Sequence, residues 1–184
     1  MTTVKSRTPA AVAIGVLALV ACCVMLPQDQ RARRSQISAM HRAYVVKHFV
    51  DCDSSDDIRQ LMSIPNLVLF LDNDLAVQAR ASRGTMVQLH KSVLQRKDLP
   101  SIQFWRVAND LTGSEISDSI SGWLEEQEAD STGHWGGNGG VYWVSNGRVL
   151  ATVPYAYGAG FENLLQTTLR VFSRKGIDEG QTGR

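Results

Sequence analysis

The chain has 184 residues, 43% of them hydrophobic and 20% charged, which is typical of one globular domain with a short appendage and excludes wholesale disorder, a collagen-like repeat and a multi-span membrane protein. Five of the 19 basic residues but only one of the 18 acidic residues precede residue 35, so the remainder, with 14 basic and 17 acidic residues, carries a net charge of about −3. A mildly acidic body argues against nucleic acid as a partner, because nucleic-acid affinity depends on the neutralisation of phosphates.

An apolar run, AAVAIGVLALVACCVML, occupies residues 10–26, with Lys5 and Arg7 before it and three arginines soon after it. A helix of this length reaches about 26 Å at about 1.5 Å per residue, so crossing a hydrocarbon core of about 30 Å requires flanking residues as well. We therefore expect residues 1–27 to be a membrane anchor or signal segment. It would contact the membrane through residues 9–27 and localise the chain to a membrane as a single-pass protein.

Three fates of this segment stay open. The run continues to the basic residues, as an uncleaved single-pass anchor does. A positively charged start and an apolar middle are also typical of a cleaved secretory signal. The string Leu19-Val20-Ala21-Cys22 resembles a bacterial lipobox, and a lipoprotein of this kind would be acylated at Cys22. Slightly more basic residues follow the run than precede it, which favours a cytoplasmic body, but the side of the membrane stays open.

The rest of the chain divides into a polar linker, one domain and a tail. Residues 28–43 are polar and aperiodic and predict a linker or a helix that extends the anchor. Hydrophobic periods of strand and helix then alternate over residues 44–173, which predicts an α/β domain. Residues 174–184 have no apolar pattern and predict a flexible tail.

The first half of the domain predicts two strands and two helices. A β-prone stretch at 44–50 comes first, and Ser54, three residues before Asp57, predicts the start of a helix. The continuous apolar run 67–71 predicts a central strand that is covered on both faces. Residues 75–96 then form a long helix-prone segment with a core-facing apolar stripe.

The second half predicts a strand, a helix, a hairpin and a last helix. Residues 102–107 have strand character, and a capping-box pattern at Thr112 precedes an apolar helical stripe. The pair Asn146-Gly147 favours the positive φ angles of a tight turn between strands at 141–144 and 149–153. Apolar residues at helical spacing over 161–172 predict an amphipathic helix on the sheet.

In chain order the body is therefore β-α-β-α-β-α-β-β-α, with the last two strands antiparallel. This order, the strand 67–71 entering a long helix, and the string VYWVSNGRVLATV leading to the last helix resemble the thioredoxin family. The resemblance implies a thioredoxin-like three-layer α/β/α sandwich with a central mixed sheet, preceded by the N-terminal transmembrane or signal helix. It requires the strand 67–71 to lie beside the strand 141–144.

The family's reactive Trp-Cys-x-x-Cys motif stands at the start of the long helix, where the helix N-terminus lowers the pKa of a thiol. When the chain is aligned at the end of the strand, Leu75 takes the place of the tryptophan. The two cysteines are replaced by Ala76 and Ala79, and the spacer between them by Val77 and Gln78. The family's cis-proline is replaced by Gly139 or Gly140. Both sulfurs are absent, so the resemblance implies a redox-inactive member, because alanine cannot attack a disulfide.

A few polar and aromatic residues beside this position are candidate contacts for a partner. Asp74 follows the central strand at the edge where open α/β sheets bind ligands, although it also suits a helix cap. His134 and Trp135 lie in a glycine-rich loop next to the family's groove, and an exposed aromatic residue there suits a protein or peptide partner.

Other features predict no metal or cofactor. The four histidines lack the spacing of metal ligands, and the acidic residues at 51–57 lack the glycine and the distal glutamate of a calcium loop. Cys52 is the one thiol of the body, between Asp51 and Asp53, whose charges oppose formation of a thiolate.

We therefore expect a membrane-anchored thioredoxin-like domain without the dithiol active site, acting as a non-catalytic binding or scaffolding module. It would hold an extended peptide beside residues 75–79 and the glycine-rich loop. The alternatives are a thiol-dependent redox enzyme or sensor that uses Cys52, a lipoprotein acylated at Cys22, and a structural envelope protein with only superficial likeness to thioredoxin.

Overall fold

The computed structural model describes residues 30–72, 77–108, 115–127 and 138–173, which belong to two units, Met1–Ala39 and Met40–Arg184. In the first unit, the described residues from 30 onward are helical and almost all exposed, and the helix ends at residue 48 in the second unit. Within the described ranges, no helix has the length and apolar character to cross a membrane. The apolar run 10–26 lies outside those ranges, so its expected role stays a prediction.

Five strands of the second unit form one mixed sheet in the order β1-β3-β2-β4-β5. Their bounds are Val50–Asp51 for β1, Leu67–Asp72 for β2, Gln103–Ala108 for β3, Asn138–Ser145 for β4 and Arg148–Val153 for β5. The first three strands are parallel to one another, and β4 is antiparallel to both β2 and β5. Val68 is opposite Trp143, so the strands predicted at 67–71 and 141–144 are neighbours, as expected.

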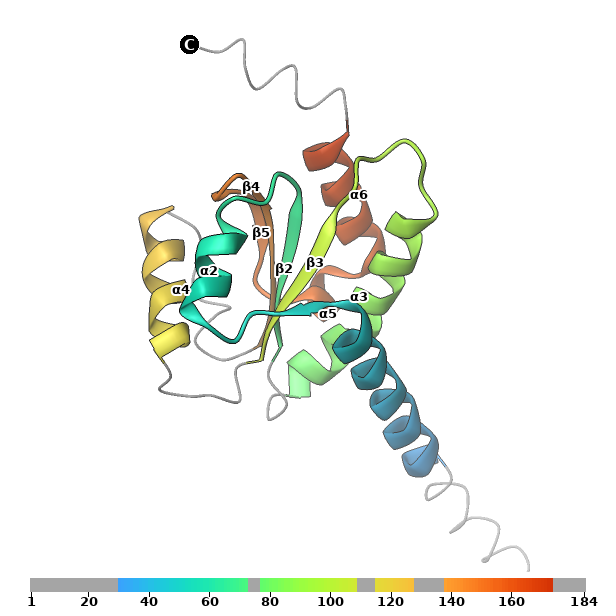
Figure 1. Ribbon diagram of the computed structural model, residues 1–184. Coiled ribbons are helices and arrows are strands. Elements are labelled where there is room, and N and C mark those ends of the chain that lie inside the picture. The colour runs from blue at the N-terminus through green and yellow to red at the C-terminus, as the bar shows by residue number, and fades with distance from the viewer. Residues whose placement is uncertain (1–29, 73–76, 109–114, 128–137, 174–184) are drawn as a thin grey trace, which may run out of the picture. The chain divides into compact units, whose positions relative to one another are not determined.

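Helices cover both faces of this sheet (Figure 1). On one face lie α2, Ser55–Leu61, and α4, Glu115–Glu126. On the other lie α3, Val77–Leu94, and α6, Phe161–Phe172, together with the one-turn helix α5, Ala156–Ala159. The fold class is therefore α/β with a central mixed sheet, as the alternation of hydrophobic periods predicts.

The strand β2 is the centre of the core. Every residue of it is buried, which confirms the prediction from its continuous apolar run. Val68 and Phe70 pack into the cluster under α3 and α6, whereas Leu67, Leu69 and Leu71 pack into the cluster under α2 and α4. This two-residue alternation is the pleat of a strand with helices on both sides.

Two local predictions are confirmed in detail. The backbone N–H of Asp57 donates to Ser54 Oγ at 3.2 Å, and the Ser54 N–H donates to the Asp57 carboxylate at 3.0 Å, which completes a capping box at the start of α2. At the hairpin, Asn146 has a φ of 49° and Gly147 a φ of 74°, the left-handed pair that a two-residue turn requires.

The prediction of a strand beginning at Tyr44 is wrong, because residues 44–48 are the last turn and a half of the helix that starts before them. Val45 and Phe49, four residues apart, are both buried in the cluster under α3. This spacing suits one helical face as well as a strand, and the helical residues upstream decide between the two. Only Val50–Asp51 remains as strand β1.

Candidate functional site

The site with the strongest expectation is the carboxyl end of β2 and the start of α3, where the reactive motif of the resembled family would stand. Val77, in the first turn of α3, is 67% exposed, Gln78 is exposed, and Ala79 is fully buried. The remaining candidate residues lie outside the described ranges, and they are Cys22, Asp74, Leu75, Ala76, His134 and Trp135.

The start of β4 packs directly against this part of α3. Gly139 has a φ of 83°, and a Cβ placed on it would lie 2.6 Å from Ser82 Cβ and 3.4 Å from Ala79 Cα. No side chain fits in that space, so glycine is required there both by backbone conformation and by contact. The structure thus brings Ala79 and Gly139 close together, and Gly140, which follows in β4, is buried.

A third segment, which the sequence analysis did not predict, joins the same place. The backbone N–H of Tyr157 in α5 donates to Ser82 Oγ at 3.1 Å, and the Ser82 side chain is fully buried. The Tyr157 ring is 63% exposed. A four-residue helix has too few residues to show a hydrophobic period, so no sequence signal indicates α5 or its contact with α3.

A buried ion pair lies at the end of β2, close to this site in the chain. Arg83 Nε of α3 lies 2.7 Å from Asp72 Oδ1, and both side chains are buried. Arg106 of β3 places Nη1 3.5 Å from Asp72 Oδ2 and pairs through Nε with the Asp51 carboxylate of β1. Two arginines and two aspartates therefore join the carboxyl ends of three parallel strands to α3, with their charges balanced.

Cys52 has none of the properties of an attacking thiol. It is 3% exposed, and its backbone N–H donates to Arg106 O at 2.9 Å. Burial, followed by the carboxylates of Asp57 and Asp53, raises the pKa of the thiol to about 12. At neutral pH it is protonated, which is the opposite of what a redox enzyme or sensor based on this residue requires.

The histidines of the described ranges contribute to packing. Tyr44 Oη lies 3.0 Å from His90 Nδ1, and this hydrogen bond fastens the helix that ends at residue 48 to α3. Burial, with a smaller contribution from His48, lowers the pKa of His90. No group of three or more potential metal ligands occurs among the residues that the structure describes.

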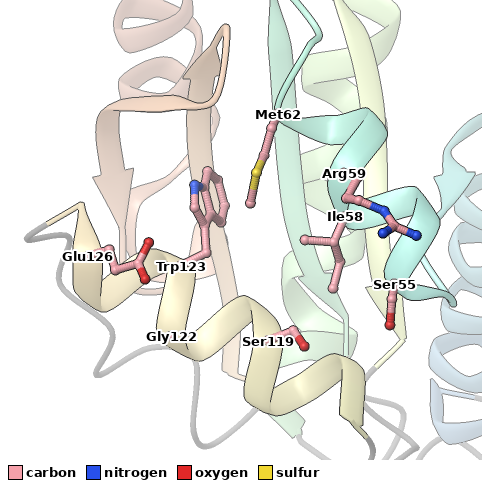
Figure 2. A pocket seen from close by; sticks show the side chains of 8 residues that line it. All are labelled: Ser55, Ile58, Arg59, Met62, Ser119, Gly122, Trp123 and Glu126. Atoms are coloured by element: carbon pink, nitrogen blue, oxygen red, sulfur yellow. The ribbon is translucent and has the colours of Figure 1, made fainter.

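A hollow lies between α2 and α4, on the sheet face opposite α3, with a volume of about 330 Å³ (Figure 2). From α2 it is lined by Ser55, Ile58 and Arg59, and from the residue that follows this helix by Met62. From α4 it is lined by Ser119, Gly122, Trp123 and Glu126. Its apolar floor and mixed polar rim suit a protein contact.

Comparison of the chain with family models and with curated proteins finds no match.

Proposed function

We propose that the second unit is a thioredoxin-like domain that binds an extended protein or peptide segment without exchanging disulfides. The observation that carries the proposal is the convergence of the α3 start, the β4 start and α5 around Ser82. The pairing of β2 with β4 in a mixed sheet, which the thioredoxin resemblance requires, supports the fold part of the proposal.

The described surface at this convergence suits binding. Val77 and Tyr157 expose an aliphatic and an aromatic side chain from two of the three segments, and Gly139 keeps the third segment close to α3. Exposed apolar and aromatic side chains fixed on rigid elements are typical of recognition surfaces. An extended peptide would lie across them and be retained by apolar contact.

The same position is not equipped for dithiol chemistry. Alanines stand at both cysteine positions of the motif, and the nearest thiol in the chain, Cys52, is buried and protonated. Disulfide exchange requires a thiolate that attacks and a second thiol that resolves the mixed disulfide. Recognition without turnover is the function that remains.

Membrane attachment is part of the proposal and rests on the sequence. The apolar run 10–26 between basic flanks supports a single-pass attachment of the domain. The proposal therefore places the binding surface near a membrane, on the side that the topology of the anchor decides.

Binding is tested with the full chain in neutral detergent and with reduced, carboxymethylated lactalbumin as an extended, thiol-blocked probe. Val77→Asp should weaken binding by about tenfold, which corresponds to about 1.4 kcal/mol, because it places a charge in an apolar contact. Leu94→Asp is the matched control, since Leu94 lies in the same helix and is also 67% exposed. The control should bind like the natural chain.

Equal loss in both variants, or no measurable binding by the natural chain, would contradict the proposal. An aspartate in the first turn of α3 is compatible with the helix dipole, so Val77→Asp is expected to fold. Circular dichroism of both variants verifies this before binding is compared.

A further inference from the structure

The hollow between α2 and α4, on the sheet face opposite the proposed peptide surface, has the form of a groove for one more helix. Ile58 of α2 and Met62, the C-cap of that helix, face Trp123 of α4 (Figure 2). Met62 is 38% exposed although it is a large apolar side chain. A Cβ placed on Gly122 would meet no atom within 4 Å, so the α4 wall is open where a side chain would otherwise fill it.

The two helices that form the groove are strongly acidic. Their sequences, SDDIRQL and EISDSISGWLEE, contain six acidic residues and one basic residue. That basic residue, Arg59, pairs with Asp56 in its own helix. The Glu126 carboxylate lies at the rim beside Trp123 (Figure 2). The α4 end of the groove, with Glu126 and its exposed neighbour Glu125, therefore suits a partner that combines an apolar side chain with positive charge.

Such a segment is present in this chain. Residues 30–40 are helical, contain three arginines and no acidic residue, and are almost entirely exposed. Arg33, Ile37 and Met40 recur at i, i+4 and i+7 and therefore lie on one helical face. Ile37 is 52% and Met40 63% exposed. Eleven helical residues span about 16 Å, close to the length of α4.

We propose that residues 30–40 of one chain dock in the α2–α4 groove of a second copy. Ile37 and Met40 would cover Met62 and Trp123, and Arg33 and its neighbour Arg34 would face the acidic end of α4. Each chain carries one segment and one groove, so the contact is heterologous and couples two copies of the protein.

Self-association is measured by sedimentation equilibrium of the full chain in neutral-headgroup detergent at low salt. Arg33→Glu with Arg34→Glu should weaken it by about tenfold or more, and Glu125→Lys with Glu126→Lys should do the same. Mixing the two reversed chains pairs an acidic segment with a basic groove and should restore association. Lys97→Glu with Arg170→Glu changes the net charge as much as the arginine reversal, at exposed residues outside α2 and α4, and should have no effect.

Filling the groove gives a test that does not depend on charge. Gly122→Leu projects a side chain into the open space and should abolish association, whereas leucine favours a helix more than glycine does and should preserve the fold. Binding of the lactalbumin probe by this variant should be unchanged. A loss of self-association can therefore be distinguished from a loss of peptide binding.

Several results would overturn the proposal. A monomer at every concentration would do so, as would association that survives both charge reversals or is not restored in the mixture. The same holds if the basic segment prefers a membrane, with the chain monomeric in detergent and the arginine reversal only reducing binding to vesicles that contain phosphatidylglycerol.

Discussion

Asp72 is the residue on which the described part of the site depends most. Its carboxylate pairs with Arg83 and Arg106 at the point where β2 ends. Asp72→Asn leaves the buried Arg83 guanidinium opposite a neutral amide. Removing one partner of a buried pair should lower the free energy of unfolding by about 3–5 kcal/mol, as measured by urea denaturation.

Asp98→Asn is the control for this prediction. Asp98 pairs with Arg96 at 3.1 Å on the exposed surface, so its loss should change stability far less. Equal effects of the two substitutions would show that the buried pair contributes nothing beyond an ordinary surface contact.

His90 predicts a dependence of stability on pH. Burial lowers its pKa in the folded chain below the value in the unfolded chain, about 6.5. The unfolded chain therefore binds the proton more readily, so stability is complete above pH 6.5 and declines as the pH falls from there toward the folded pKa. α3 contains no acidic residue that could stabilise a protonated His90.

The measurement is the unfolding free energy of the natural chain and of His90→Gln between pH 5 and pH 8. The variant should show a flatter profile, since glutamine keeps a hydrogen-bond acceptor near Tyr44 and does not titrate. His48→Gln removes only the smaller of the two causes that lower the pKa of His90, so the decline of stability toward low pH should persist in that variant. An unchanged slope in the His90 variant would contradict this account.

At the scale of single residues, alignment with the family identified positions but not contacts. The proximity of Ala79 and Gly139 is suggested in the sequence only through the resemblance to thioredoxin, which remains a prediction. The sequence does not predict Ser82, Arg83 or Tyr157. Their partners are 11 to 75 residues away in the chain, and neither charge nor hydrophobic period links such distant positions.

At the scale of elements, the β4–β5 hairpin gives a sharp prediction. Gly147 has a φ of 74°, and a Cβ placed on it would lie 2.9 Å from Met62 O. Gly147→Ala should therefore cost about 1–2 kcal/mol, from the left-handed conformation and the contact with the end of α2. The midpoint of urea denaturation measures this loss.

Gly122→Ala is the matched control for the hairpin variant. Gly122 is helical and has open space at its Cβ, so alanine should leave stability unchanged or raise it by up to about 1 kcal/mol. If both substitutions shift the midpoint in the same direction, the prediction is wrong, and the positive φ of Gly147 does not explain the effect of replacing it.

Elements with a long or distinctive pattern could be predicted, and those with an ambiguous pattern could not. The apolar run of β2, the Asn146-Gly147 turn and the stripe of α6 each fit one structure only. The stretch beginning at Tyr44 fits both a helix and a strand, and packing of Val45 and Phe49 against α3 favours the helix. Tertiary packing therefore determined the secondary structure of this stretch, because its local sequence preference did not.

At the scale of the whole molecule, a basic N-terminal segment precedes a mildly acidic α/β domain in the chain. The mixed sheet positions the α3 start, β4 and α5 on one face and the α2–α4 groove on the other. In both proposed surfaces, exposed apolar side chains are held on helices or directly beside them. At the first surface, the aligned positions of the dithiol motif carry alanines, which is why we propose binding there.

Reduction of insulin disulfides by the full chain in the presence of dithiothreitol tests this central claim most directly. The natural chain and Cys52→Ser should both give no turnover above the dithiothreitol background. Ala76→Cys combined with Ala79→Cys should give turnover, because it supplies two thiols with the spacing of the Cys-x-x-Cys motif. Turnover by the natural chain that disappears in Cys52→Ser would contradict the account.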